Sequence, residues 1–325
     1  MAFVWLLIGL VLIIKGADVL IDSAAKLAGR FGVSTFIIGI TVVAFGTSAP
    51  ELVVGLVSGL AGANALTLGN AVGSSLANMA FITGVAALIL PLAVRDSVVR
   101  REIPLLLGVQ LVLCALLFFD GTLSHWDGAI LLVGFAGFLT YVVRGTRQSL
   151  PAHVDAQGDL DTDNDGNGLP PAPPQPMGKL LVLTVLSLVA LGLGGKLTVD
   201  SSIEIAALFG MSETLIGLTV LSLATTMPEL ITAVTAARKG EPEIVLGNAI
   251  GSSLFNILFV LGASAALHPI AAEPGLAVDA AAMVATTAVV FAFSAAHRRI
   301  RRLSGVLLVV GYIAYLTWKV LAVVL

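Results

Sequence analysis

The chain is poor in charged, aromatic and thiol side chains. Of its 325 residues, 11% are charged, 6% are aromatic, and Cys114 is the single cysteine. One cysteine permits neither an intrachain disulfide nor a thiolate metal cluster, and we expect Cys114 to be a small buried residue in an apolar run. No basic stripe with interleaved aromatic residues occurs, so the sequence offers no surface for nucleic acid.

Apolar residues are in excess. They make up 58% of the chain, against about 45–50% in a soluble domain, and the mean hydropathy is +1.03. The first apolar run has no preceding positive charge and no Ala-x-Ala cleavage site, so we interpret it as a span and not as a removed signal. The sequence therefore predicts an integral membrane protein, surrounded by lipid.

Apolar runs long enough to cross about 30 Å of hydrocarbon need around 20 residues. Ten such runs occur, and we expect an all-α protein with ten transmembrane helices. They lie near residues 2–22, 33–60, 66–91, 102–119, 126–144, 178–199, 211–237, 243–268, 275–296 and 303–324.

The two halves of the chain repeat one another. Gly-Thr-Ser-Ala-Pro-Glu at 46–51 returns as Ala-Thr-Thr-Met-Pro-Glu at 224–229, and the segment at 69–78 returns at 247–256, always 178 residues later. Each repeat holds five spans, and an odd number forces the second repeat to enter the membrane from the opposite side. We therefore predict two inverted five-helix repeats, at 1–144 and 178–325.

Basic residues mark one side of this arrangement. Of the 17 lysines and arginines, 14 fall in loops on the same predicted side. By the positive-inside rule this side is cytoplasmic, so both termini are predicted to be extracytoplasmic. The 14 residues are Lys26, Arg30, Arg95, Arg100, Arg101, Arg144, Arg147, Lys179, Arg238, Lys239, Arg298, Arg299, Arg301 and Arg302.

Residues 145–177 form the predicted cytoplasmic linker, which is acidic and rich in proline. The run from Asp161 to Gly166 matches the start of a calcium loop of the EF-hand kind, but Ala172 stands where the twelfth residue should be glutamate. We interpret the segment as a solvated linker, and weak calcium sensing remains the alternative.

Oxygen-bearing side chains gather around the two repeated motifs. Glu51 and Glu229 are ionisable groups at membrane depth, where they are costly and by default mark an ion path. Pro50 and Pro228 interrupt their helices and free backbone carbonyls there. The neighbouring candidate ligands are Thr47, Ser48, Ser74, Asn78, Thr225, Thr226, Ser252 and Asn256. If the repeats face each other, these groups form an all-oxygen site suited to a hard cation such as Ca²⁺.

Other chemistries fit less well. His125, His268 and His297 lie at predicted helix ends and His153 in the linker, without ligand spacing, so we interpret them as interfacial or solvated. An intramembrane hydrolase would need a base beside a nucleophile, which no serine has at membrane depth. A channel is disfavoured because the duplicated motifs predict a closed site. We therefore predict a protein that is not an enzyme.

The motifs Gly-Thr-Ser-x-Pro-Glu and Gly-Asn-x-x-Gly-Ser, each present twice at matching spacing, closely resemble those of the sodium/calcium exchanger family, of the cation/calcium antiporter superfamily and of prokaryotic type. The resemblance implies that fold, alternating access, and Na⁺-driven Ca²⁺ extrusion across the prokaryotic inner membrane. It makes Glu51 and Glu229 the central Ca²⁺ ligands shared with Na⁺. Thr47 and Thr225 would supply carbonyl and hydroxyl oxygens. The Na⁺ sites would be completed by Ser48, Ser74, Asn78, Thr226, Ser252 and Asn256. It implies no cofactor and no obligate protein partner, so a monomer is expected.

Two departures from the family pattern bear on the coupling ion. Thr226 stands where serine is usual, and Asn256 stands where many relatives carry aspartate, which disfavours potassium-dependent exchange. The alternative is H⁺/Ca²⁺ exchange, as in a sister family that carries a glutamate soon after the Gly-Asn of the second motif. Here Ala71 and Ala249 follow that asparagine instead.

Overall fold

The computed structural model describes residues 1–148, 176–209, 221–272 and 275–324, and nearly all of them are helical. The elements of the first repeat are α1 (Ala2–Phe31), α2 (Thr35–Ile38), π-helix η1 (Gly39–Val43), α3 (Ala44–Thr47), α4 (Ala49–Leu60), α5 (Asn64–Ala77), π-helix η2 (Asn78–Ile82), α6 (Thr83–Ile89), β1 (Leu92–Ala93), π-helix η3 (Val98–Glu102), α7 (Ile103–Asp120), β2 (Thr122–Leu123) and α8 (His125–Gln148). Those of the second are α9 (Met177–Leu208), α11 (Ser222–Thr225), α12 (Met227–Arg238), α13 (Pro242–Phe255), π-helix η5 (Asn256–Leu261), α14 (Gly262–Leu267), β3 (Ile270–Ala271), α15 (Leu276–His297), β4 (Arg299–Ile300) and α16 (Arg302–Val324).

The membrane spans follow the predicted ones. Among the described residues, eight helices are long and apolar enough to cross a bilayer, and a bent pair formed by Thr35–Thr47 and Ala49–Leu60 makes a ninth. The span predicted at 211–237 is described only in its later part, as α11 and α12. The predicted linker is described only at its ends, where α8 continues to Gln148 and α9 begins at Met177. The rest of it, with His153 and the Asp161 motif, lies outside the described residues.

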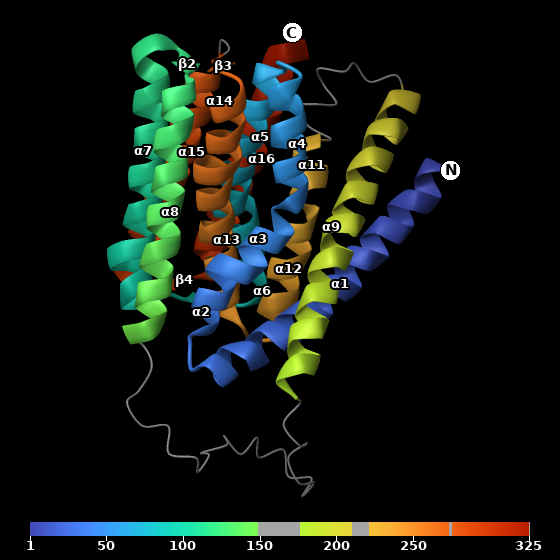
Figure 1. The fold of residues 1–325 in the computed structure, drawn as a ribbon, viewed down its shortest axis with the longest axis vertical. Coiled ribbons are helices and arrows are strands. Elements are labelled where there is room, and N and C mark those ends of the chain that lie inside the picture. Colours follow the sequence, from blue (N-terminus) through green and yellow to red (C-terminus); the bar gives the residue numbers. More distant parts are fainter. Residues whose placement is uncertain (149–175, 210–220, 273–274, 325) are drawn as a thin grey trace, which may run out of the picture.

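Two short antiparallel ribbons show that the repeats are inverted. β1 pairs with β4, and β2 pairs with β3. The displacement of 178 residues carries β1 onto β3 and β2 onto β4, so it exchanges one ribbon for the other. The ribbons lie at opposite ends of the bundle, with β2 and β3 at the top of Figure 1 and β4 near the bottom. The second repeat is therefore inverted relative to the first.

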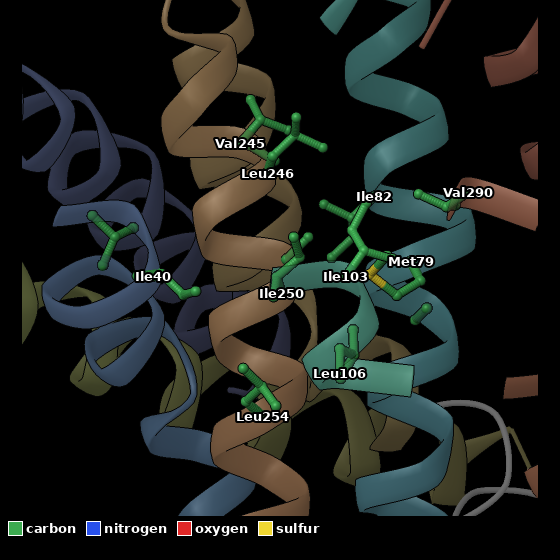
Figure 2. Packing of buried hydrophobic residues seen from close by; sticks show 14 of the residues in the cluster. Ile40, Met79, Ile82, Ile103, Leu106, Val245, Leu246, Ile250, Leu254 and Val290 are labelled. Atoms are coloured by element: carbon green, nitrogen blue, oxygen red, sulfur yellow. The ribbon is translucent and has the colours of Figure 1, made fainter. Parts of the chain in front are cut away.

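Helix α13 occupies the middle of the bundle. Every residue from Ile244 to Phe255 is buried. Figure 2 shows its side chains between Ile40 of η1 on one side and Ile103 and Leu106 of α7 on the other. This burial places the Gly-Asn-x-x-Gly-Ser motif of the second repeat, residues 247–252, at the centre of the protein.

Helices α1 and α9 lie as a crossed pair at one side of the other helices (Figure 1), in contact along their length. Small residues permit this close packing, since a Cβ added to Gly194 would lie 2.8 Å from the carbonyl oxygen of Gly9. Both termini point toward the upper end of Figure 1. The lower end, where α1 and α8 end and α9 begins, carries the 14 basic residues, and we name it the basic end.

Candidate ion-binding site

The first motif of each repeat breaks its helix. Helix α3 ends at Thr47 and α4 starts at Ala49, with Ser48 between them, and the two parts of the span are bent by 49°. In the second repeat α11 ends at Thr225 and α12 starts at Met227. Pro50 and Pro228 cause the breaks, because proline lacks the N–H that would continue the hydrogen-bond ladder and fits the first turn of a new helix.

The breaks place both glutamates at helix starts. Glu51 lies in the first turn of α4 and Glu229 in the first turn of α12, where the partial positive charge of the helix N-terminus favours a carboxylate. Both side chains are 1% exposed. They lie near enough to each other for their charges to repel. Two carboxylates in one buried volume can both stay charged only if a positive charge compensates them.

All ten predicted site residues are buried, none more than 5% exposed. The hydroxyls of Thr225 and Ser74 face the carboxylate of Glu51. Those of Thr47, Ser48 and Ser252 face the carboxylate of Glu229, to which Ser48 donates a hydrogen bond of 3.0 Å. Thr47 and Ser48 of the first repeat thus face the carboxylate of the second repeat, and Thr225 faces that of the first. Sequence spacing alone does not reveal this exchange.

Many polar atoms of the site have no hydrogen-bond partner among the described residues. The two oxygens of Glu51 and one of Glu229 are buried without one, as are the Ser74 hydroxyl and the amide groups of Asn78 and Asn256. None of the ion pairs that the described residues form involves either glutamate. Each buried polar group without a partner costs about 1–3 kcal/mol. A bound cation would satisfy these oxygens together.

The two asparagines of the predicted site begin irregular segments. Asn78 is the first residue of η2, and Asn256 is the first residue of η5. The hydroxyl of Thr83 donates a 2.8 Å bond to the Asn78 carbonyl, five residues earlier, which stabilises the wider turn. Such π-helical turns are rare and often lie at functional sites. They rotate the side chains at the centre of the bundle in a way that helical periodicity does not predict.

Two further asparagines, Asn70 and Asn248, were missed as site residues by the sequence reasoning. Thr47 donates a 3.1 Å hydrogen bond to Oδ1 of Asn248, and Thr225 donates one of 3.5 Å to Oδ1 of Asn70. Nδ2 of Asn70 also donates to the backbone carbonyl of Glu51. A threonine whose proton is donated elsewhere presents only lone pairs to the site. The signal was present in the sequence, since both belong to the repeated Gly-Asn motif.

We expect Asn248→Ala to weaken the binding of the transported cation roughly 10- to 100-fold, the usual cost of removing a group that orients a metal ligand. The variant loses the acceptor for the Thr47 hydroxyl, whose proton can then turn toward the site. Cation-dependent thermal stabilisation of the purified protein measures the change. Asn64→Ala, at the start of α5 and outside the site, is the matched control. Equal affinity in both variants would contradict the orienting role.

The remaining candidates for metal chemistry lie apart from the site. His125 begins α8, and His268 and His297 close α14 and α15, as predicted. Within the part of the chain that the structure describes, no three His, Cys, Asp or Glu residues cluster as a metal site. Cys114 is only partly buried, contrary to expectation, because α7 lies on the outside of the bundle.

Known proteins share this architecture. The family model described as sodium/calcium exchanger protein matches residues 1–144 and 179–321. The putative antiporter CaxA of Alkalimonas amylolytica is 37% identical over 318 residues, covering 97% of each chain. The sodium/calcium exchanger MaX1 of Methanosarcina acetivorans is 33% identical, again over 97% of each chain.

The fold matches that of a solved member of the same family. A structure of the sodium-calcium exchanger NCX_Mj, soaked with Na⁺ and Sr²⁺, superposes with a TM-score of 0.80 at 28% identity, covering 98% of this chain and 99% of that one. Sequence and fold therefore agree over nearly the whole length. This chain is a multi-pass membrane protein that belongs to the sodium/calcium exchanger family.

Proposed function

We propose that the protein is a secondary-active antiporter that exchanges Na⁺ for Ca²⁺ and extrudes Ca²⁺ electrogenically by alternating access. The observation that carries the proposal is the group of buried oxygens around Glu51 and Glu229. Within the described parts of the chain, the two carboxylates have no ion-pair partner and the group has too few hydrogen-bond donors. Oxygen is the ligand that Ca²⁺ and Na⁺ prefer. The ten site residues named from the sequence are the proposed ligands, and no resident cofactor takes part.

The charge of the site limits what can be exchanged. Two carboxylates balance one Ca²⁺ or two Na⁺. A third Na⁺ would leave about one positive charge, and moving that charge across the membrane is worth about 2.3 kcal/mol per 100 mV. A cycle that returns Na⁺ inward in this excess is therefore driven by both the Na⁺ gradient and the membrane potential.

The names of the relatives support the coupling ion. MaX1 and NCX_Mj are both described as exchangers of sodium and calcium. We infer the same pair of ions for this chain, because the positions that would carry additional carboxylates hold uncharged residues. Ala71 and Ala249 follow the Gly-Asn motif, and Asn256 takes the place of an aspartate.

The basic end is assigned to the cytoplasm, and both termini to the outer side of a prokaryotic inner membrane. The positive-inside rule gives this orientation. Extrusion of Ca²⁺ then proceeds from the basic end toward the end at which the chain begins and finishes.

Uptake of ⁴⁵Ca²⁺ by proteoliposomes tests the proposal. Vesicles loaded with Na⁺ are diluted into Na⁺-free buffer at clamped voltage and are compared with K⁺-loaded vesicles and with vesicles under a pH gradient. We expect uptake only with internal Na⁺, and faster uptake under an inside-positive potential, because each cycle carries one net positive charge out of the vesicle with Na⁺. If the pH gradient alone drives uptake, the coupling ion is H⁺ and not Na⁺.

A further inference from the structure

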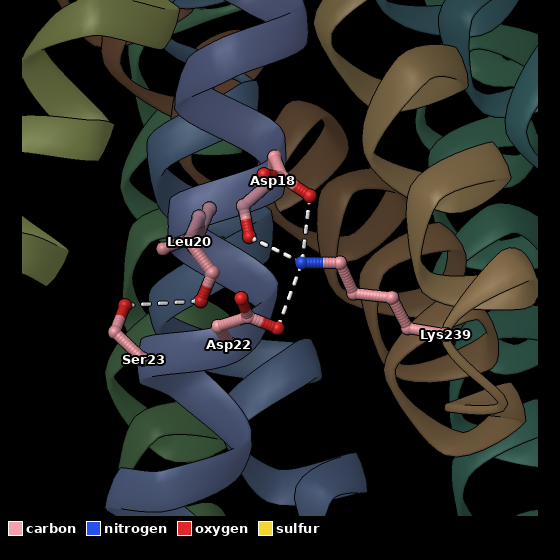
Figure 3. Close-up of polar contacts among 5 residues, drawn as sticks. All are labelled: Asp18, Leu20, Asp22, Ser23 and Lys239. Atoms are coloured by element: carbon pink, nitrogen blue, oxygen red, sulfur yellow. Dashed lines mark hydrogen bonds and ion pairs between the residues drawn. The ribbon is translucent and has the colours of Figure 1, made fainter.

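Lys239 joins helix α1 to the turn between α12 and α13. Its Nζ lies 2.7 Å from a carboxylate oxygen of Asp18 and 2.7 Å from one of Asp22, and it donates a 2.8 Å hydrogen bond to the backbone carbonyl of Asp18. Figure 3 shows the ammonium between the two aspartates, which lie one turn apart on α1. Burial alone would lower the pKa of Lys239, but the hydrogen bonds to Asp18 and Asp22 more than offset it and raise the pKa.

The helix that Lys239 holds belongs to the pair that covers the ion site. Across from α1, Gly195 of α9 lies against both site prolines, because a Cβ added there would lie 2.6 Å from Pro50 and 3.2 Å from Pro228. The glutamates that follow these prolines are buried. Among the described residues, the site is therefore covered, and α9 is one of the helices that cover it.

The inverted repeat predicts a counterpart of this contact at the other end, and the counterpart is missing. The displacement of 178 residues carries Asp18 to Lys196, Asp22 to Asp200 and Lys239 to Ala61. Lys196 and Asp200 form an ion pair of 2.6 Å within α9 itself. Ala61, in the turn after α4, has no charge to offer. The pair of covering helices is thus attached by this ion-pair cluster at the basic end, whereas the three corresponding residues form no such attachment at the opposite end.

We propose that Lys239, Asp18 and Asp22 form a one-sided latch that holds α1 against the core at the basic end and keeps that end closed when the site is open to the other side. The proposal rests on the alternating access proposed above. Since the corresponding residues form no latch at the other end, the resting population favours the conformation that is open outward.

The latch is expected to bias the equilibrium without locking it. The aspartate side chains are 53% and 56% exposed, and each such ion pair is weak in water. Two of them together change the ratio of the two conformations roughly three- to tenfold. A bias of this size leaves transport possible, while it sets the fraction of molecules ready to bind an ion from either side.

Distances between spin labels test the latch without any transport measurement. In the Cys114→Ala background, Lys26→Cys on α1 and Arg301→Cys at the start of α16 place labels at two exposed positions of the basic end. Lys239→Met removes the ammonium but keeps the aliphatic stem. The first distance population corresponds to the conformation that is closed at the basic end, and the second to the conformation that is open there. We expect the second population to grow roughly three- to tenfold relative to the first. Arg238→Met, the adjacent exposed basic residue, is the matched control.

A mirrored latch supplies the opposite test. Ala61→Lys with Lys196→Asp gives the other end the same three charges. Because a latch there would keep that end closed, we expect it to enlarge the second population further in the Lys239→Met protein. Unchanged distances in Lys239→Met, or equal changes in Arg238→Met, would overturn the latch. The labels measure conformation and not transport. If Na⁺-driven uptake fails, the distances still test the latch, and if the latch fails, the exchange proposal is unaffected.

Discussion

Glu51→Gln and Glu229→Gln are each expected to abolish Ca²⁺ transport while leaving an inserted and folded protein. Each substitution keeps the volume of the side chain but removes one of the two charges that balance Ca²⁺. Removing one member of a buried charge pair costs about 3–5 kcal/mol, which corresponds to at least about a 100-fold loss of affinity. Both glutamates are buried, so water cannot replace the missing charge. The proteoliposome assay described above measures the loss.

Glu102 provides the control for this experiment. It is also a buried glutamate, 7% exposed, but it lies at the basic end and accepts a 2.9 Å hydrogen bond from Tyr141. Glutamine can accept the same bond, so Glu102→Gln should transport Ca²⁺ at the rate of the unchanged protein. Robust exchange in Glu51→Gln or Glu229→Gln would remove both residues from the proposed site, and equal losses in all three variants would point to a general effect on folding.

The span pattern and the repeat could be predicted because each rests on a long signal. About 20 apolar residues are needed for one helix, and ten such runs leave little freedom in counting. The displacement of 178 residues is constant from Asp22 to Gly262. The repeat therefore predicts an inversion. The two ribbons show it, because the displacement carries the β1–β4 ribbon onto the β2–β3 ribbon. Proline at 50 and 228 likewise predicts the two helix breaks, because its missing N–H has the same effect in any helix.

Contacts between the repeats could not be predicted in the same way. Spacing placed Thr47 beside Glu51, four residues later, but the break at Ser48 interrupts that face, and Thr47 instead bonds to Asn248 and faces Glu229. The π-helical turns at Asn78 and Asn256 shift the register of the following residues. Both effects depend on which helix lies opposite, which is information that a local pattern does not hold. The latch at Lys239 likewise depends on which helix lies opposite it.

Gly251→Ala is expected to destabilise the protein and abolish transport, although it adds only one methyl group. Helix α13 passes so close to η1 that a Cβ on Gly251 would lie 2.5 Å from the carbonyl oxygen of Ile40 and 2.7 Å from Cβ of Ala44. Neither neighbour is a flexible side chain, so the backbone of η1 must move. Overpacking of this kind costs about 1–3 kcal/mol and occasionally more.

The displaced segment leads directly to the ion site. The carbonyl of Ala44 accepts hydrogen bonds from Thr47 and Ser252, so a shift of η1 and α3 misplaces both hydroxyls. We expect a lower temperature of unfolding in detergent together with loss of Ca²⁺ uptake. Gly137→Ala, at an exposed position of α8 with open space around it, should leave both unchanged. If Gly251→Ala melts like the control and still transports Ca²⁺, then α13 and η1 are farther apart in the working protein than these contacts require.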